Sequence, residues 1–454
     1  MVPDRGHAPK LVEPAVKILR RFSFQVSLMN ESILEAGART RSRGYAIYVL
    51  AILLLVSTLN FIDRIVIGVL AGPIKADLGL SDTQLGLLGG TAFGLFYATL
   101  GIPIGWLADR SNRVWIMTGA LALWSAFTAL CGTAQSFSQL FLARIGVGVG
   151  EAGGSAPGYS LISDYFPPSQ RARALAVFSF GIPIGSGLGL ALGGVIATMV
   201  DWRVTFFALG LFGLLVAPVL RATVREPVRG AFEGHAQPAP SHSAREVLAT
   251  LARKPAFWAL SFGGGISGIA GYGLIFWMPS FIMRSFGLTL VETSLFLGAL
   301  IFVGGISGMW AGGWLVDRLS HRGKAAYGIV PAIAFLLLLP FQVGALLATS
   351  AVVAFLLLLL PEALRVMWLG PGISAVQHLV PPGMRAMASA IFLLINNLVG
   401  LGLGSLLIGA LSDALAVHYG TESLRYAILA AMSFYAIAAI IFFFASRWFD
   451  RDWE

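Results

Sequence analysis

Long apolar runs dominate this sequence and restrict what it can fold into. About twelve stretches hold some 20 or more mostly apolar residues, enough for a helix to cross a hydrocarbon core of about 30 Å. Charged residues make up only 12% of the chain, against about 25% in soluble domains. We therefore predict an all-α integral membrane protein. The predicted spans are residues 45–70, 82–107, 114–134, 138–163, 172–199, 203–221, 255–283, 290–316, 325–348, 350–377, 385–412 and 424–446.

One long segment of the sequence occurs twice. Residues 157–178 read PGYSLISDYFPPSQRARALAVF and residues 371–392 read PGISAVQHLVPPGMRAMASAIF, with ten identities in 22 positions. A second pair, GWLADRSNR from Gly105 and GWLVDRLSHR from Gly313, has nearly the same spacing. Duplicated halves are typical of membrane transporters. We predict two six-helix bundles of equal orientation, related by a pseudo-twofold axis along the membrane normal.

The half boundary and the charge distribution set the expected topology. Of the 31 Lys and Arg residues, four fall on the outer side if both termini are cytoplasmic, and three fall within spans. This asymmetry follows the positive-inside rule, so the net charge of +9 indicates orientation in the cell membrane rather than nucleic-acid binding. We expect a cytoplasmic leader over 1–44, bundles over 45–221 and 255–447, a cytoplasmic linker over 222–254 and a cytoplasmic tail over 448–454.

Several chemistries have no support in the sequence. Cys131 is the single cysteine and the six histidines are scattered, which excludes a Cys–His zinc site and an internal disulfide. We find no nucleophile–base constellation and no phosphate-binding glycine loop near a lysine. We therefore expect no enzyme activity, no metal and no cofactor beyond a proton gradient, in a protein that acts as a monomer.

Ionisable residues within the predicted spans are the first candidates for function. A charge at the bilayer centre costs at least about 2.5–3.5 kcal/mol, so it normally faces a partner or a watery cavity. Asp63 and Arg144 fall at similar depth in the first and fourth spans, and we predict that they form an ion pair, with Arg64 turned away by about 100°. Glu151, two turns beyond Arg144, is expected to be a second titrating group. The alternative is a static link between two helices.

The repeat places Arg365 at the position equivalent to Glu151. Glu362 lies one turn before Arg365, and the two are expected to pair locally, either in the substrate cavity or as a purely structural contact. Pro157 and Pro371 are expected to break the fourth and tenth spans, and interrupted helices at matching positions indicate a binding site. Polar and aromatic residues expected to line the same cavity are Asn60, Tyr97, Tyr159, Tyr272 and Trp368.

Two motifs resemble those of the major facilitator superfamily. The loop after the second span has the pattern GxLxDRxxR, formed by Gly105, Leu107, Asp109, Arg110 and Arg113. Its second copy supplies Gly313, Leu315, Asp317, Arg318 and, one residue late, Arg322. The fourth span adds Leu140-x3-Arg144-x3-Gly148. The resemblance implies that the loop, including Gly105, Asp109, Arg110, Arg113, Asp317 and Arg318, holds the inner side closed in one state and does not bind substrate.

A narrower likeness concerns the first half. The runs Asn60-Phe61-Ile62-Asp63-Arg64 and Gly148-Val149-Gly150-Glu151-Ala152 look like those of the spinster family. That resemblance implies export of lysophospholipids or sphingolipids coupled to protons. We therefore expect a secondary transporter of an amphipathic anion. The alternatives are a proton symporter of small organic, aromatic or sugar acids, and a non-transporting receptor or scaffold, which would gain nothing from paired charges inside the membrane.

Overall fold

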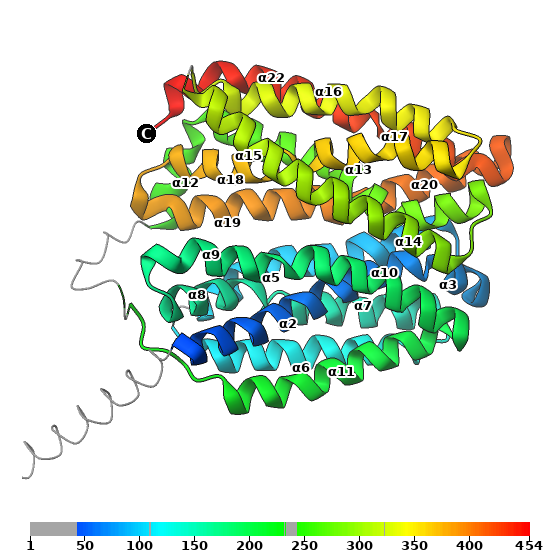
Figure 1. The fold of residues 1–454 in the computed structure, drawn as a ribbon, viewed down its shortest axis with the longest axis horizontal. Helices are drawn as coiled ribbons and strands as arrows, with labels where there is room; N and C mark the ends of the chain where they lie inside the picture. The colour runs from blue at the N-terminus through cyan, green and yellow to red at the C-terminus, as the bar shows by residue number, and fades with distance from the viewer. Residues whose placement is uncertain (1–42, 109, 231, 233–242, 322) are drawn as a thin grey trace, which may run out of the picture.

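The computed structural model describes residues 43–108, 110–230, 232, 243–321 and 323–454, and within these ranges it is built from helices without strands (Figure 1). The first half contains α2 (Arg43–Val69), α3 (Ala71–Leu78), α4 (Asp82–Gly86), the π-helix η1 (Leu87–Thr91), α5 (Ala92–Ala108), α6 (Arg113–Cys131), α7 (Phe137–Glu151), α8 (Ser155–Tyr165), α9 (Pro168–Ser179), α10 (Gly181–Met199) and α11 (Trp202–Thr223).

The remaining helices begin within the region predicted as a linker, where α12 (Ala244–Ala252) lies, and continue through the second half. They are α12, α13 (Pro255–Phe286), α14 (Leu290–Leu300), the π-helix η2 (Ile301–Gly305), α15 (Ile306–Ser320), α16 (Ala326–Leu347), α17 (Ala351–Val366), α18 (Leu369–His378), the 3-10 turn η3 (Pro382–Met384), α19 (Arg385–Asn396), the π-helix η4 (Asn397–Leu401), α20 (Gly402–Tyr419), the 3-10 turn η5 (Gly420–Glu422), α21 (Ser423–Ala431) and α22 (Ser433–Asp452).

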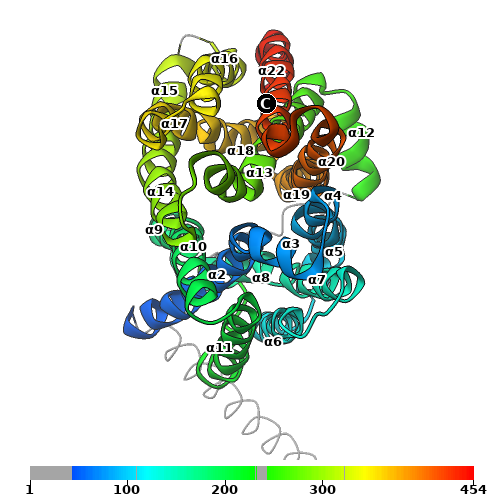
Figure 2. The ribbon, with the colours of Figure 1, turned by 90° about the vertical axis from the view of Figure 1, so that its right-hand side faces the viewer.

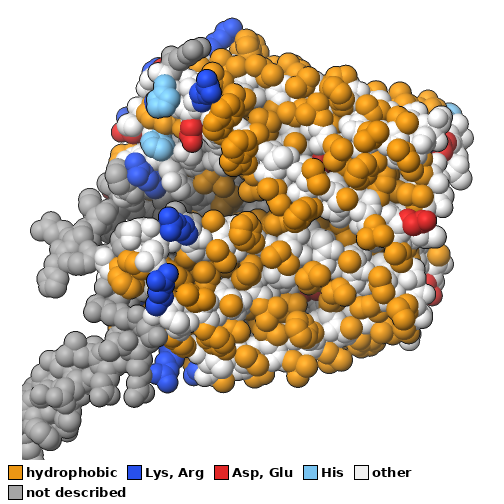
Figure 3. All heavy atoms as spheres, in the orientation of Figure 1, with side chains coloured by type: hydrophobic (Ala, Val, Ile, Leu, Met, Phe, Trp, Pro, Cys, Tyr) orange, Lys and Arg blue, Asp and Glu red, His pale blue; other side chains and the backbone are white. Residues whose placement is uncertain are grey.

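The helices of the two halves lie side by side as two groups. Helices α2 to α11 form one group and α13 to α22 the other, and both views show the same division (Figures 1 and 2). The groups touch where α2 packs on α13, α10 on α14, and α4 on α20. Lys and Arg side chains gather at the end of the molecule that carries the C-terminus, and the surface between the groups is hollowed near that end (Figure 3).

Ten helical stretches of the described chain are long and apolar enough to cross a membrane. The predicted span 138–163 is not among them because a turn divides it into α7 and α8, each shorter than a bilayer crossing. The last two predicted spans fall within one continuous stretch, residues 387–452. The multi-pass helical architecture is thus confirmed, whereas the number twelve stays a prediction.

Interrupted helices occur at equivalent positions in the two halves. A turn at residues 152–154 separates α7 from α8, and a turn at residues 367–368 separates α17 from α18. The first break directly follows Glu151. Pro157 and Pro371, which we expected at the breaks, instead lie in the first turns of α8 and α18. A proline fits there because the first N–H groups of a helix have no intrahelical partner.

In the part of the chain that the structure describes, three π-helical turns, which the sequence did not predict, interrupt the membrane helices. Two of them, η1 and η2, lie in the equivalent second and eighth predicted spans, and η4 lies in the eleventh. Turns of this kind widen a helix locally and often occur at functional sites. The described part of the predicted linker also holds a helix, α12, which begins with a capping box formed by Ser243 and Glu246.

Close approach of helices in the first half depends on small residues. A Cβ atom on Gly148 of α7 would lie 2.6 Å from the carbonyl oxygen of Phe93 on α5, so a larger residue would push the helices apart. Small residues let membrane helices pack with their backbones in contact. This contact brings the charged residues of α7 within reach of α2 and η1.

Candidate functional site: buried charges in both halves

The first charged cluster joins α2 to the end of α7. Asn60 and Arg64 are four residues apart and share one face of α2. The Asn60 Nδ2 and the Arg64 Nε each donate a hydrogen bond of 2.8 Å to the Glu151 Oε2. Glu151 is completely buried, and the Arg64 side chain is 16% exposed. The cluster is therefore a cross-helix ion pair strengthened by an amide.

The predicted ion pair between Asp63 and Arg144 is wrong. Both residues are buried, but among the described residues no ion pair joins them; Arg64, expected to point away, pairs with Glu151 instead. Arg144 donates from Nε to the carbonyl oxygen of Leu88 in η1. The prediction paired Asp63 with Arg144 only because both residues fall at a similar depth in the membrane. The long Arg64 side chain reaches a carboxylate two turns further along α7, whereas the short Asp63 side chain does not reach Arg144.

Aromatic rings surround the Arg64 guanidinium. Its Cζ lies 4.3 Å from the ring centroid of Tyr97, 5.0 Å from that of Phe93 and 5.1 Å from that of Phe61. Such contacts are attractive when the cation is shielded from water. The Nη2 of Arg64 and the Oε1 of Glu151 are buried and have no hydrogen-bond partner in the described chain. One donor and one acceptor of this cluster are thus not committed to the protein.

The second charged cluster lies within a single helix. On α17, the Arg365 Nε donates a 2.6 Å hydrogen bond to the Glu362 Oε2, and the Nη2 donates to the Oε1, which confirms the expected local pair. Each side chain is 15% exposed. Trp368, in the turn that follows, is buried between Phe392 and Phe442 and belongs to the packing of the second half.

The tyrosines expected in the cavity differ in position. Tyr97 lies under Arg64, as described above. Tyr272 on α13 is 36% exposed and is close enough to both Arg64 and Arg365 to feel their charges. Tyr159 is 47% exposed and packs edge-on against Phe178. Tyr272 is therefore the predicted cavity residue that lies near the charged clusters of both halves.

The loop motif of the first half forms a buried ion network. Arg113 binds Asp164 at 2.5 Å and Glu226 at 2.6 Å and donates to the Ser160 hydroxyl. Asp164 and Ser160 belong to the first half, and Glu226 lies just after α11 in the predicted linker. Arg110 lies over the ring of Trp106 and Arg318 over that of Trp314, whereas Asp109 lies outside the described residues. Gly105 lies on α5, the helix before the first loop, and Asp317 lies on α15, the helix before the second copy of the loop.

A polar network at the opposite end was missed by sequence reasoning. Asp82 at the start of α4 receives two hydrogen bonds of 2.9 Å from Arg284 of α13 and one of 2.5 Å from Lys75. Asp413 of α20 accepts from the backbone N–H groups of Asp82 and Thr83, which satisfies donors left free at a helix start. The network joins the two halves where α4 meets α20 (Figure 2). In the sequence, these residues look like ordinary charges flanking membrane spans.

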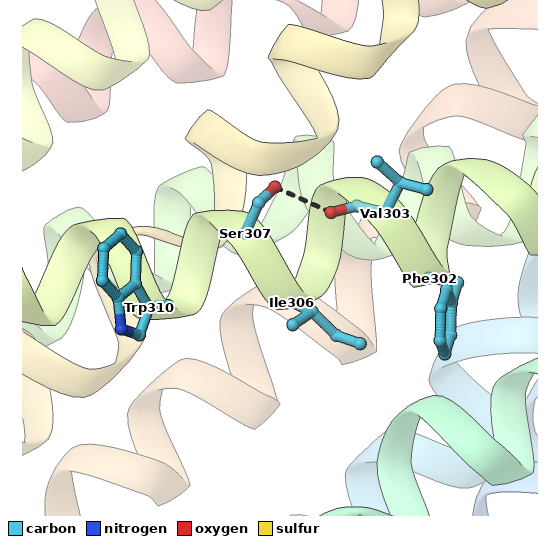
Figure 4. A pocket seen from close by; sticks show the side chains of 5 residues that line it. All are labelled: Phe302, Val303, Ile306, Ser307 and Trp310. Atoms are coloured by element: carbon cyan, nitrogen blue, oxygen red, sulfur yellow. Dashed lines mark hydrogen bonds between the residues drawn. The ribbon is translucent and has the colours of Figure 1, made fainter.

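A groove on the outer surface of η2 and α15 is not a comparable site. It has a volume of about 340 Å³ and is lined by Phe302, Val303, Ile306, Ser307 and Trp310 (Figure 4). Its one hydroxyl, from Ser307, donates to the carbonyl oxygen of Val303 in its own helix. Exposed apolar side chains on a membrane helix with satisfied polar groups are what contact with lipid requires.

Comparison with known proteins gives a consistent result. The family model of the Major Facilitator Superfamily matches residues 53–402. The chain is 36% identical over 404 residues to an MFS-type efflux pump of Mycolicibacterium smegmatis, covering 88% of this chain and 92% of the pump. It is 31% identical to human protein spinster homolog 1, covering 82% and 74% of the two chains.

A solved structure with the same fold is also similar in sequence. A bacterial homologue of the human lysosomal transporter spinster, in an inward-facing and unoccupied conformation, superposes with a TM-score of 0.82 at 33% identity. The match covers 91% of this chain and 99% of that one. The fold and the sequence thus point to the same group of proteins.

Proposed function

Because this chain belongs to the major facilitator superfamily and is homologous to the spinster proteins, we propose that it is a proton-coupled transporter of an amphipathic anion. A lysophospholipid or a sphingolipid would fit this description. It is a membrane transporter and not an enzyme. The proposed mechanism is alternating access, in which two bundles rock about a site between them.

We infer twelve spans in two six-helix bundles related by a pseudo-twofold axis. The matching breaks in α7–α8 and α17–α18, and the π-helical turns η1 and η2, support this inference. Counting α7 with α8 as one span, and separating α19–α20 from α21–α22, gives twelve. The gathering of Lys and Arg at the end with the C-terminus supports cytoplasmic termini in a cell membrane.

Asp63 carries the proposal of proton coupling. It is 5% exposed, and in the described chain it forms no ion pair, although Arg144 and Glu151 are close enough to act on it electrostatically. Protonation of Glu151 would break its bond to Arg64, whereas protonation of Asp63 breaks no ion pair. Asp63 is therefore the acid that can gain and lose a proton while the cross-helix pair stays intact.

The charge balance of the buried groups favours an anion as the substrate. Asp63, Glu151 and Glu362 balance Arg64, Arg144 and Arg365, so the charges of these six intramembrane groups sum to zero when all are ionised. Protonation of one acid leaves an excess positive charge that a single anion neutralises. Uncompensated charge inside a membrane is costly, so a proton and an anion should stabilise each other's binding. The unpartnered Arg64 Nη2 offers the anion a donor.

A small organic acid is the second candidate substrate. The same charge balance would serve it, and the three aromatic rings around Arg64 would suit an aromatic acid. What separates the two candidates is the apolar tail. The resemblance to the spinster family, which implies lipid export, supports the first candidate, since the chain is similar to a spinster protein over 82% of its length.

Flux in proteoliposomes tests the proposal. We expect the wild type to move a radiolabelled lysophospholipid, followed by extraction into albumin, faster when a pH gradient is imposed. Asp63→Asn should lose that stimulation while remaining folded. An Asp63→Asn protein that still responds fully to the gradient would remove Asp63 from this role. Wild-type protein that moves labelled benzoate but no lysolipid would favour the second candidate, and no flux of either would favour a receptor or scaffold.

A further inference from the structure

A small pocket between the halves contains three polar side chains that no motif singled out together. It encloses about 50 Å³ and is bounded by Ile65 of α2 and Leu190 of α10 on one side. The second half supplies the other walls, and they are apolar except for Gln342, Glu362 and Arg365. Ligand pockets that enclose whole small molecules measure about 300–1,000 Å³. In this conformation the pocket can hold one small group and not a whole ligand.

Gln342 is the unexpected member of this group. Its side chain is 4% exposed, lines the pocket and has no hydrogen-bond partner in the described part of the chain. The amide oxygen and nitrogen are not among the fully buried unpartnered atoms of the described chain, so they face the open space of the pocket. A leucine, which is similar in size, would form an apolar wall without an unpartnered polar group. The amide therefore needs an explanation other than packing.

The neighbouring ion pair between Glu362 and Arg365 also has a hydrogen-bond donor without a partner in the described chain. Arg365 uses its Nε and Nη2 for Glu362, and its Nη1 has no partner among the described residues. Among the lining residues, Arg365 thus keeps a free donor and Gln342 keeps a donor and an acceptor, while Glu362 neutralises the charge of Arg365.

This chemistry selects an uncharged polar group. A bare anion gains little from a guanidinium that a carboxylate already neutralises, and it would lie beside that carboxylate. A hydroxyl or an amide can donate to Gln342 or Glu362 and accept from Gln342 or Arg365 without adding charge. The surrounding walls, which include Leu274, Met278 and Leu358, suit the start of an apolar chain.

We propose that Gln342, Glu362 and Arg365 form a subsite for a hydroxyl or amide group at the junction between the head group and the apolar chain of the substrate. The inference rests on the proposed transport of an amphiphile. Tyr272 lies within electrostatic reach of both Arg64 and Arg365, so the anionic group at Arg64 and the uncharged group at this subsite can belong to one molecule.

A pair of probes tests the subsite directly. The probes are a lysophosphatidic acid with a free glycerol hydroxyl and its 2-deoxy analogue with the same acyl chain. Their dissociation constants are measured with full-length protein in nanodiscs. We expect the wild type to prefer the hydroxylated probe by about tenfold, the discrimination expected when a buried polar group loses its partner. Gln342→Leu should remove the preference, because it lowers the affinity for the hydroxylated probe and leaves the affinity for the 2-deoxy probe unchanged.

Two further variants make the result interpretable. Leu300→Ile changes the shape of the same pocket without changing hydrogen bonding, and it should affect both probes equally. Gln342→Asn keeps the amide on a shorter side chain and should retain part of the preference if Gln342→Leu proves unstable. Equal affinities of the two probes for the wild type, or a Gln342→Leu protein that keeps the preference, would overturn the subsite.

The result also separates the subsite from the proposed function. Wild-type protein that transports both probes under a pH gradient without discriminating between them would overturn the subsite alone. Wild-type protein that neither binds nor moves either probe would overturn the proposed function, and the subsite with it.

Discussion

The two charged clusters differ in what holds them together. In the first half, Glu151 of α7 is bound by Asn60 and Arg64 of α2, so the pair bridges two helices. In the second half, Glu362 and Arg365 are three residues apart on α17. A shift of α2 against α7 changes the first pair, whereas no movement between helices changes the second. A contact between helices can couple to motion, and a contact within one helix can only present its groups to a ligand.

The repeat makes this difference meaningful. Glu151 and Arg365 occupy equivalent positions, each shortly before a break in its helix. Both halves therefore share the helix break, but the charged residue shortly before it is an acid in the first half and a base in the second. We interpret the first half as the site of proton coupling and the second as a site of substrate recognition.

The largest effect is expected when the cross-helix pair loses one partner. Glu151→Gln leaves the Arg64 guanidinium mostly buried without a carboxylate, and breaking a buried pair in this way costs about 3–5 kcal/mol. We expect a clear fall in Tm and at least about a hundredfold loss of gradient-driven flux, equivalent to about 2.7 kcal/mol. Both are measured on purified protein and in proteoliposomes.

A double variant separates stability from coupling at this pair. Arg64→Leu with Glu151→Leu removes both charges and should recover much of the Tm, because replacing a buried ion pair by apolar residues is often neutral. It should not recover transport. Recovery of gradient-driven flux in the double variant would show that the pair is only a structural link between helices. It would contradict the assignment of proton coupling to the first half.

In the second half, the corresponding change should affect affinity and leave coupling intact. We expect Glu362→Gln combined with Arg365→Gln to raise the apparent KM for lysolipid by about tenfold, the loss of roughly one well-placed polar contact. The ratio of flux with and without a pH gradient should match that of the wild type. Loss of the gradient dependence in this variant would place coupling in both halves.

The sequence predicted the architecture better than the contacts. Apolar runs and the repeat were enough to predict membrane helices and paired interruptions, because these depend on length, hydropathy and backbone breaks. The partner of Arg64 was not predictable in the same way. Asp63 and Arg64 are adjacent, and the choice between them depends on side-chain length and on how α7 packs against α5 at Gly148. Gln342 gave no signal, since one amide in an apolar run is common.

The network around Asp82 extends the comparison to the end of the molecule. Lys75 and Asp82 belong to the same half, whereas Arg284 and Asp413 belong to the other. Opening between the halves at this end must break the bonds of Asp82 to Arg284 and of Asp413 to the start of α4, and it can leave Lys75 in place. The Asp82 carboxylate therefore contacts Arg284 of the other half and Lys75 of its own half.

The smallest predicted effect is a shift in the population open at this end. Arg284 is 27% exposed, so we assign its bond to Asp82 only about 0.7 kcal/mol, within the range of partly exposed pairs. Arg284→Gln should therefore raise the ratio of open to closed molecules about threefold. The measurement is the distance distribution between spin labels at Ala76→Cys and Val417→Cys, two exposed positions, since the native Cys131 is buried. Lys75→Gln is the matched control and should leave the distribution unchanged, because its contact does not cross between the halves. An equal shift in both variants would mean that the charge of Asp82, and not the link between the halves, controls the opening.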